Sequence, residues 1–112
     1  QLEALLEFIK REMQRTLEKE IVAWADDRKI FEQSTASLQF SKTLEEVNEL
    51  YDGIQEGDVD EIADAIGDVM VTLIIQANMW GLSATDCLTG VYKEISKRKG
   101  MMVNGKFVKE ME

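Results

Sequence analysis

The absence of proline most constrains what this chain can fold into. None of the 112 residues is proline, and the glycines are concentrated after residue 52. Because proline and glycine are the residues that most often interrupt a helix, few positions can end one. Apolar residues recur at the helical period along most of the chain. We therefore predict one small all-α domain over residues 1–112, whose core is completed by association with other copies.

The periodicity predicts four helices and a short tail. The helices are expected over residues 2–27, from Ser34 or Thr35 to Gly57, from Asp58 to Gly81, and from Ser83 or Thr85 to Lys97. The third is apolar almost all round after residue 68, so it should be the central, most buried helix. Residues 101–109 contain Asn104-Gly105 and predict a hairpin or extended arm. The lone Cys87 is expected to be a small buried residue without chemistry.

Charge and residue content exclude several classes of function. The net charge of −9 argues against binding to nucleic acid, which needs Lys and Arg opposite the phosphates. Because the chain has no histidine, any metal must be held by oxygen, which favours Mg²⁺, Mn²⁺ or Ca²⁺. No apolar run approaches the length of a membrane span or resembles a secretory signal, so we expect a soluble cytoplasmic protein.

Two acidic clusters on successive predicted helices indicate a cation site. The clusters are Glu45, Glu46 and Glu49 on the second helix, and Glu61, Asp64 and Asp68 on the third. Carboxylates three or four residues apart share one helix face. Two such faces repel each other unless a cation lies between them, and we expect Mg²⁺, with Mn²⁺ as the alternative.

Ordinary solvated helix faces are the competing interpretation in so acidic a chain. Asp64 and Asp68 lie among apolar residues, where unpaired carboxylates are costly to bury. Gly67 interrupts the same apolar helix at a cost of about 1 kcal/mol relative to alanine. We attribute this glycine to the close approach of another helix or a ligand. Both features favour a binding site.

Three segments resemble a known enzyme family. The segments are Leu44-Glu45-Glu46-Val47-Asn48-Glu49-Leu50, Asp52-Gly53-Ile54-Gln55-Glu56-Gly57-Asp58 and Asp64-Ala65-Ile66-Gly67-Asp68. They are similar to the all-α nucleoside triphosphate pyrophosphohydrolases of the MazG type, particularly the short single-domain forms of bacteria and phages. The family pattern is Glu-Glu-x-x-Glu followed by Glu-x-x-Asp on the next helix. The resemblance implies a four-helix-bundle-like fold in the cytoplasm of a bacterial or phage-infected cell.

The second half of the family pattern fits in two ways. With Asp68 as the final Asp, Ala65 stands where the preceding Glu is expected, and Asp64 lies one position earlier. Alternatively, Glu61 and Asp64 form the literal Glu-x-x-Asp, with a shorter connection to the first cluster. We prefer the first register because Gly67-Asp68 then matches a Gly-Asp often seen in the family. The fourth metal ligand is therefore Asp64 or Glu61.

The resemblance implies hydrolysis of a nucleoside triphosphate between its α- and β-phosphates, giving a nucleoside monophosphate and pyrophosphate. Glu46, Glu49 and Asp68, with Asp64 or Glu61, would hold the metal. Glu45 is adjacent to the ligands on a different azimuth, and it is our candidate for orienting or deprotonating the attacking water.

Basic residues are the candidates for phosphate binding. Lys42 lies one helical turn before the first acidic cluster and could reach a phosphate there. Lys97, Arg98 and Lys99 either complement the dipole of the fourth helix or, as the family's C-terminal signature implies, face the phosphates. Asn78 is a weaker candidate for contacting the base or sugar. Trp24 and Trp80 could stack on a base, although tryptophans at helical spacing more often belong to a core or interface.

The family resemblance also implies a homodimer, or a homotetramer built as a dimer of dimers, in which the C-terminal basic residues of one copy could serve the site of its neighbour. The alternative function is a non-catalytic acidic helical module that binds a protein partner. The dense Asp/Asn/Gly loop of an EF-hand is missing, so we do not expect a calcium-binding protein of that class.

Overall fold

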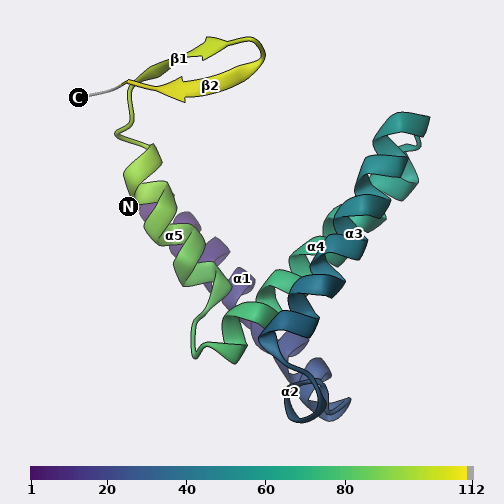
Figure 1. Cartoon of the computed structure of the whole chain (residues 1–112). Coiled ribbons are helices and arrows are strands. Elements are labelled where there is room, and N and C mark those ends of the chain that lie inside the picture. The colour runs from purple at the N-terminus through teal and green to yellow at the C-terminus, as the bar shows by residue number, and fades with distance from the viewer. Residues whose placement is uncertain (111–112) are drawn as a thin grey trace.

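The structure is a computed structural model that describes residues 1–110. Over these residues, the elements are α1 (Leu2–Asp27), α2 (Ile30–Gln33), α3 (Ala36–Glu56), α4 (Val59–Met79), α5 (Ala84–Ile95), β1 (Gly100–Val103) and β2 (Lys106–Lys109). The prediction of an all-α chain with a short C-terminal hairpin is confirmed (Figure 1).

Most helix ends lie where the sequence predicts them. α1 covers the expected residues 2–27, and Thr35 caps α3 by accepting a backbone hydrogen bond of 3.2 Å. Gly57 ends α3 in the left-handed region (φ 66°), and Asp58 then caps α4 with a bond of 3.1 Å. The unexpected element is α2, a single turn inside the predicted loop, which begins after the left-handed Lys29 (φ 62°).

α3 and α4 form an antiparallel helical hairpin joined by only two residues. The helices approach closely at Gly53, where an added Cβ would lie 3.2 Å from Glu61 Cγ and 3.3 Å from the Ile62 side chain. At Gly67, where the sequence predicts the close approach of a helix or a ligand, no other helix of the same chain lies within 4 Å of the Cβ position. The glycine that brings the two helices together is therefore Gly53.

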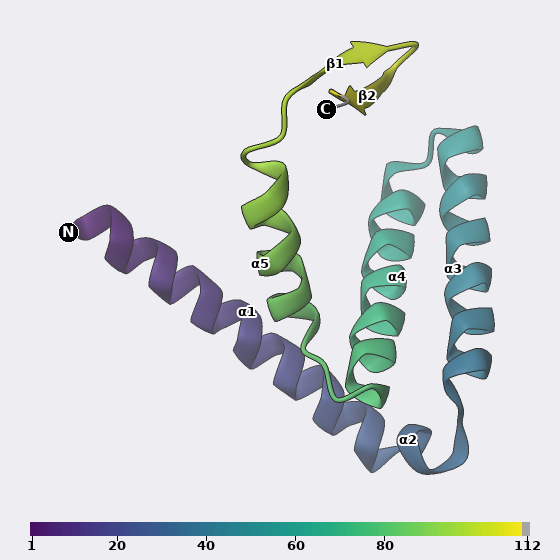
Figure 2. The ribbon, with the colours of Figure 1, turned by 60° about the vertical axis from the view of Figure 1, so that its left-hand side comes forward.

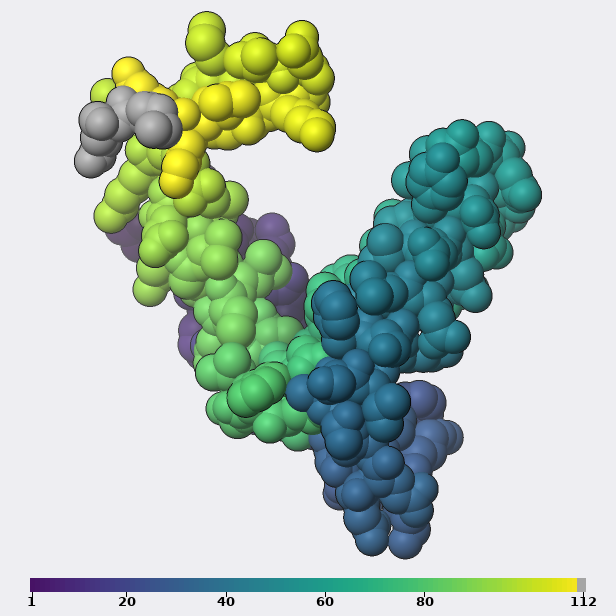
Figure 3. All heavy atoms as spheres, in the orientation of Figure 1, coloured from purple at the N-terminus to yellow at the C-terminus, as the bar shows by residue number. Residues whose placement is uncertain are grey.

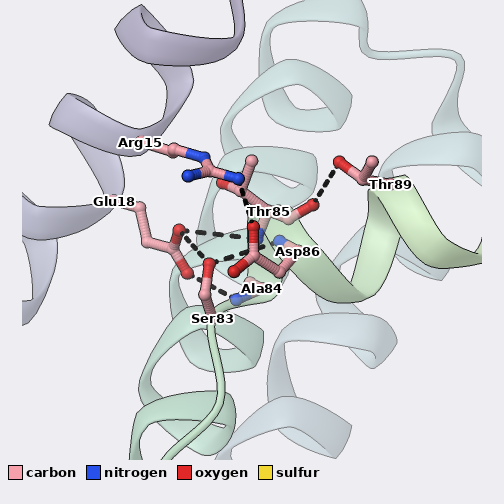
Figure 4. Close-up of polar contacts among 7 residues, drawn as sticks. All are labelled: Arg15, Glu18, Ser83, Ala84, Thr85, Asp86 and Thr89. Atoms are coloured by element: carbon pink, nitrogen blue, oxygen red, sulfur yellow. Dashed lines mark hydrogen bonds and ion pairs between the residues drawn. The ribbon is translucent and has the colours of Figure 1, made fainter.

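A buried carboxylate fastens α1 to the start of α5 (Figure 4). Glu18 of α1 accepts hydrogen bonds from Ser83 Oγ (2.9 Å), from the Ala84 amide and from the Thr85 amide (3.4 Å). Burial alone raises the pKa of Glu18, but the hydrogen bonds from residues 83–85 outweigh it and lower the pKa. Beside it, Arg15 pairs with Asp86 at 2.6 Å. Glu18 thus supplies the capping charge for a helix that is distant in sequence.

The helices form an open V rather than a closed bundle. α3 and α4 make one arm, and α5 with its terminal hairpin makes the other (Figure 1). α1 ends at the base of the V, and its N-terminal part diverges from α5 (Figure 2). The space-filling view shows the two arms standing apart above a narrow base (Figure 3). The radius of gyration is 16.9 Å, whereas a compact chain of this length has about 13 Å.

The buried core of one chain is small. Its buried apolar residues are Ala25, Ala65, Ile75 and Ala77. Three of these lie on α4, which contacts α1, α3 and α5 and is therefore the central helix, as predicted. One face of α4 is nevertheless uncovered, since Val59 and Met70 are 74% and 56% exposed. α4 is therefore central, but a single chain leaves part of its apolar surface exposed.

By length and composition alone, α4 could cross a membrane. This corrects the expectation that no apolar segment is long enough, because Val59–Met79 reaches the required mean hydropathy despite its carboxylates. One such helix is weak evidence for a span. Asp64 and Asp68 would have to enter the hydrocarbon, which is costly.

The C-terminal tail forms the predicted hairpin. β1 and β2 pair antiparallel, with Gly100 opposite Lys109, and Asn104-Gly105 turns with φ of 51° and 81°.

Cys87 corrects another expectation, because it is exposed rather than buried. α5 carries an uncovered apolar face, so its amphipathic pattern does not place Cys87 in a core.

Candidate metal centre on α3 and α4

The structure brings together three of the predicted metal ligands. Carboxylate oxygens of Glu46, Glu49 and Asp68 all lie within 4.8 Å of one another. Glu46 and Glu49 come from α3, and Asp68 comes from the facing turn of α4. Glu46 is buried, Glu49 is exposed and Asp68 is half-buried. We call these three residues the acidic cluster.

Glu46 is the least satisfied member of the acidic cluster. Only 7% of the Glu46 surface is exposed. Its Oε1 atom lies 3.3 Å from Lys42 Nζ, but Oε2 is buried without a hydrogen-bond partner. Because a buried carboxylate oxygen is costly when unpaired, this atom has an unmet requirement for a positive charge or a donor. An all-oxygen set of three carboxylates fits a hard divalent cation.

The pKa values of the neighbouring groups show the same excess of negative charge. Hydrogen bonding to Glu46, and then its charge, raise the pKa of Glu49. Burial, followed by the charges of Asp64 and Glu46, raises the pKa of Asp68. Conversely, the hydrogen bond to Glu46 raises the pKa of the Lys42 ammonium. One lysine therefore faces several carboxylates that repel one another.

Glu61 and Asp64 lie outside the group of three but remain close enough to act on it. The charge of Glu61 contributes to the raised pKa of Glu49, and that of Asp64 to the raised pKa of Asp68. Ala65, at the position where the family pattern has Glu, is 1% exposed and packs in the core. Both candidate fourth ligands therefore act on the cluster through their charge, although neither belongs to the group of three.

The predicted water-orienting residue, Glu45, is not a member of the acidic cluster. Its side chain is 69% exposed and its Oε2 atom lies 4.0 Å from Lys42 Nζ. Lys42 therefore bridges Glu45 and Glu46. This arrangement keeps Glu45 near the site without making it a member of the cluster.

Other predicted substrate residues are not brought to the cluster within one chain. Lys97, Arg98 and Lys99 follow α5 on the opposite arm of the V (Figure 1). Asn78 is ten residues beyond Asp68 on α4, about 15 Å along the helix axis.

The two tryptophans have partners of their own. Trp80 donates to Gln76 Oε1 at 3.0 Å. The guanidinium of Arg28 lies 4.5 Å from the ring centre of Trp24. Both rings are largely exposed, so neither belongs to the core of a single chain.

The sequence interpretation missed a row of polar residues beside the cluster. Gln39, Thr43 and Glu46 are all buried on α3, and Thr72 is buried on α4. Their spacing of four and three residues places the α3 members on one helix face. That spacing of polar residues, on the face away from the apolar stripe, is the signal that could have revealed them.

Comparison with known proteins agrees with the geometry. The family model for the MazG nucleotide pyrophosphohydrolase domain matches residues 33–102, which include the whole acidic cluster. The chain belongs to this MazG family. The family resemblance inferred from the two acidic motifs is therefore confirmed, and the acidic cluster has the oxygen ligands that a family dependent on divalent metal requires. α1 lies outside the matched residues.

One relative comes from a bacteriophage. The "Uncharacterized 18.2 kDa protein in rep-hol intergenic region" of Haemophilus phage HP1 (strain HP1c1) is 44% identical over 59 residues. The aligned segment covers 53% of this MazG chain and 36% of the phage protein. No solved structure gives a significant match.

Proposed function

We propose that this protein hydrolyses a ribo- or deoxyribonucleoside triphosphate between the α- and β-phosphates, releasing a nucleoside monophosphate and pyrophosphate, in a reaction that depends on Mg²⁺. The observation that carries the proposal is the unpartnered Oε2 of buried Glu46, beside Glu49 and Asp68 with raised pKa values. Mn²⁺ is the alternative cation, because it accepts the same oxygen ligands.

The residues divide into three roles. Glu46, Glu49 and Asp68 hold the cation, with Asp64 preferred to Glu61 as the fourth ligand. When bound, Mg²⁺ supplies positive charge to the phosphates and acidifies a water molecule. Glu45, exposed and outside the cluster, accepts the proton from the attacking water. Lys42 can turn from Glu46 to a phosphate oxygen, since its flexible ammonium makes point-charge contacts.

Further positive charge must come from outside the α3–α4 arm. This arm carries the acidic cluster, and Lys42 is its only cation. We propose that Lys97, Arg98 and Lys99 of a neighbouring copy contact the phosphates. Supporting this, these residues follow α5 on the other arm of the V and make no recorded contact with the cluster of their own chain. Asn78 remains a weaker candidate for the base or sugar.

Self-association is supported by the exposed apolar residues on one face of the α3–α4 hairpin. Exposed apolar residues recur at alternating spacings of four and three on α3: Phe40, Leu44, Val47, Tyr51 and Ile54. The corresponding exposed residues on α4 are Val59, Ile66, Met70 and Leu73. The helices touch along a line that passes through Thr43 and Gly53 on α3 and through Thr72 on α4. Each apolar stripe lies about 110° around its helix from this line. Because the helices are antiparallel and both rotations have the same sense, the stripes share one face of the hairpin.

The acidic cluster lies on the opposite side of that hairpin from the apolar stripes. A second copy can therefore cover the apolar face without blocking the cluster, and spacing by fours and threes is typical of helices that pack in bundles. The surface area agrees: the chain exposes 9098 Å², about 2,800 Å² more than the roughly 6,300 Å² of a compact monomer of its mass. That excess matches one partner's share of a large obligate interface. We propose a homodimer or a dimer of dimers.

The proposed activity is tested with a panel of ribo- and deoxyribonucleoside triphosphates, assayed for pyrophosphate release with Mg²⁺, with Mn²⁺ and with chelator. We expect release from at least one member, and only when a divalent cation is present. Sedimentation of the same preparation tests the association, with dimers or tetramers expected. No turnover on any member of the panel would refute the proposed activity, and a monomer at micromolar concentration would refute the proposed assembly.

A further inference from the structure

Thr43 and Thr72 form a buried hydrogen bond between α3 and α4. Their Oγ1 atoms are 2.9 Å apart, and the residues are 8% and 4% exposed. Thr72 Oγ1 donates to the Val69 carbonyl at 2.7 Å, so Thr43 is the donor in the cross-helix bond. Thr43 Oγ1 also lies 3.1 Å from the Gln39 carbonyl, so its single proton is shared between that carbonyl and Thr72. A second hydrogen bond between the two helices, from Gln76 Nε2 to the Ala36 carbonyl at 3.0 Å, lies nearer the open end of the hairpin. Apolar residues of similar size would fill the positions of the two threonines without any polar requirement.

The threonine pair lies one turn from the acidic cluster on both helices. Thr43 precedes Glu46 by three residues, and Thr72 follows Asp68 by four. On the other side of the cluster, α4 approaches Gly53 so closely that an added Cβ would lie 3.2 to 3.3 Å from atoms of Glu61 and Ile62. The acidic cluster therefore lies between two points at which α3 and α4 are fixed together: a glycine contact near the connection and a hydrogen bond near the open end.

A hydrogen bond between α3 and α4 at this position counteracts the electrostatic repulsion within the acidic cluster. Glu46, Glu49 and Asp68 come from both helices, and their like charges repel across the gap when no cation is bound. The repulsion would move α3 away from α4 and separate the oxygens that the cation requires. A hydroxyl pair has a short, directional optimum, so it resists both separation and sliding of the helices more than apolar contact does.

We propose that Thr43 and Thr72 act as a positioning pair that holds Glu46 opposite Asp68 before the cation binds. The inference rests on the proposed cation site but is separate from the identity of the nucleotide. The pair touches neither cation nor substrate, so it acts by keeping the carboxylate oxygens in position before the cation binds. Without it, cation binding must also draw the two helices together, and part of the binding free energy is consumed.

The test is a titration of the full chain with Mg²⁺ and Mn²⁺ in the absence of nucleotide, monitored by calorimetry. Thr43→Val and Thr72→Val each remove the cross-helix bond, and we expect each to weaken cation affinity about fivefold, the value of one net hydrogen bond. The double variant should bind no more weakly than either single variant, because the same bond is lost in all three. Thr72→Ser keeps the hydroxyl and should bind as tightly as the original protein.

Thermal unfolding in chelator separates positioning from simple stabilisation. Replacing both threonines by valine leaves no unpaired group and should change stability little, while the loss of affinity persists. Thr89→Val is the matched control, since it removes a threonine bond to the Thr85 carbonyl on α5, away from the cluster. Unchanged cation affinity in Thr43→Val and Thr72→Val would overturn the positioning proposal alone. If the original protein binds neither cation, the metal site and the positioning proposal fail together.

Discussion

Glu18 and Glu46 are buried to nearly the same degree, 8% and 7% exposed, but their surroundings are opposite. Glu18 accepts hydrogen bonds on both oxygens at the start of α5, and its pKa is lowered. Glu46 has one oxygen near Lys42 and the other unpartnered, and it raises the pKa of Glu49. Burial alone therefore does not identify a functional carboxylate. The distinction is whether the chain itself satisfies the charge, as it does for Glu18, or leaves it for a ligand.

The largest contrast is expected in activity. Glu46→Gln should lower pyrophosphate release at least about 100-fold. Loss of a residue that only supports the ligands of a metal site costs up to about 100-fold, and loss of a ligand should cost no less. Its stability in chelator should be unchanged or higher, because the variant removes an unpaired buried charge. Steady-state kinetics and thermal unfolding measure both effects. Glu56→Gln, an exposed change elsewhere on α3, is the control, and similar activity in the two variants would contradict the assignment.

Glu18→Gln should show the reverse pattern. The glutamine amide is uncharged and has only one acceptor oxygen, so it cannot accept all the hydrogen bonds that residues 83–85 donate to Glu18. We therefore expect a loss of about 1 to 2 kcal/mol in the free energy of unfolding. Activity per folded molecule should stay within about twofold, as expected for a residue outside the site. Denaturant unfolding provides the measurement. A large fall in activity without loss of stability would mean that Glu18 serves the site rather than the fold.

The pH dependence of stability should separate the carboxylate of Glu18 from that of Asp68 in the acidic cluster by sign. The pKa of Glu18 is lowered from its ordinary 4.5, so its contribution is present above pH 4.5 and is lost as the pH falls further. The pKa of Asp68 is raised, so in chelator its charge destabilises the fold at neutral pH, and this effect disappears as the pH falls through the raised pKa.

Unfolding curves from pH 7 to pH 3 measure these smaller effects. The stability advantage of the original protein over Glu18→Gln should shrink below pH 4.5. Asp68→Asn should be the more stable protein at pH 7 in chelator and lose that advantage on acidification. Parallel pH profiles for the two variants would show that the carboxylates do not differ as described.

The sequence predicts the helices well because their ends are local features. Thr35 and Asp58 cap with their own side chains, and Gly57 takes the left-handed conformation that ends α3. The acidic cluster was also predictable, since two motifs on adjacent helices with a two-residue connection leave few ways to arrange Glu46, Glu49 and Asp68.

What the sequence does not predict depends on contacts between distant residues. The role of Glu18 requires knowing that α1 meets residues 83–85, and that of Gly53 requires the register of α3 against α4. Gly67 appeared the better candidate for close approach because it interrupts an apolar helix. Cys87 was assigned to a core that one chain does not build. In each case the amphipathic pattern predicts a buried face without identifying what covers it.

The two-residue connection between α3 and α4 has a consequence for folding. Glu46 and Asp68 are only 22 residues apart, so their meeting requires a small loss of loop-closure entropy and depends on no other part of the chain. Contacts this local form early. During synthesis, Glu46, Glu49 and Asp68 would therefore be in place before α5 and Lys97, Arg98 and Lys99 leave the ribosome, so the proposed cation site can form before the proposed phosphate-binding residues are available.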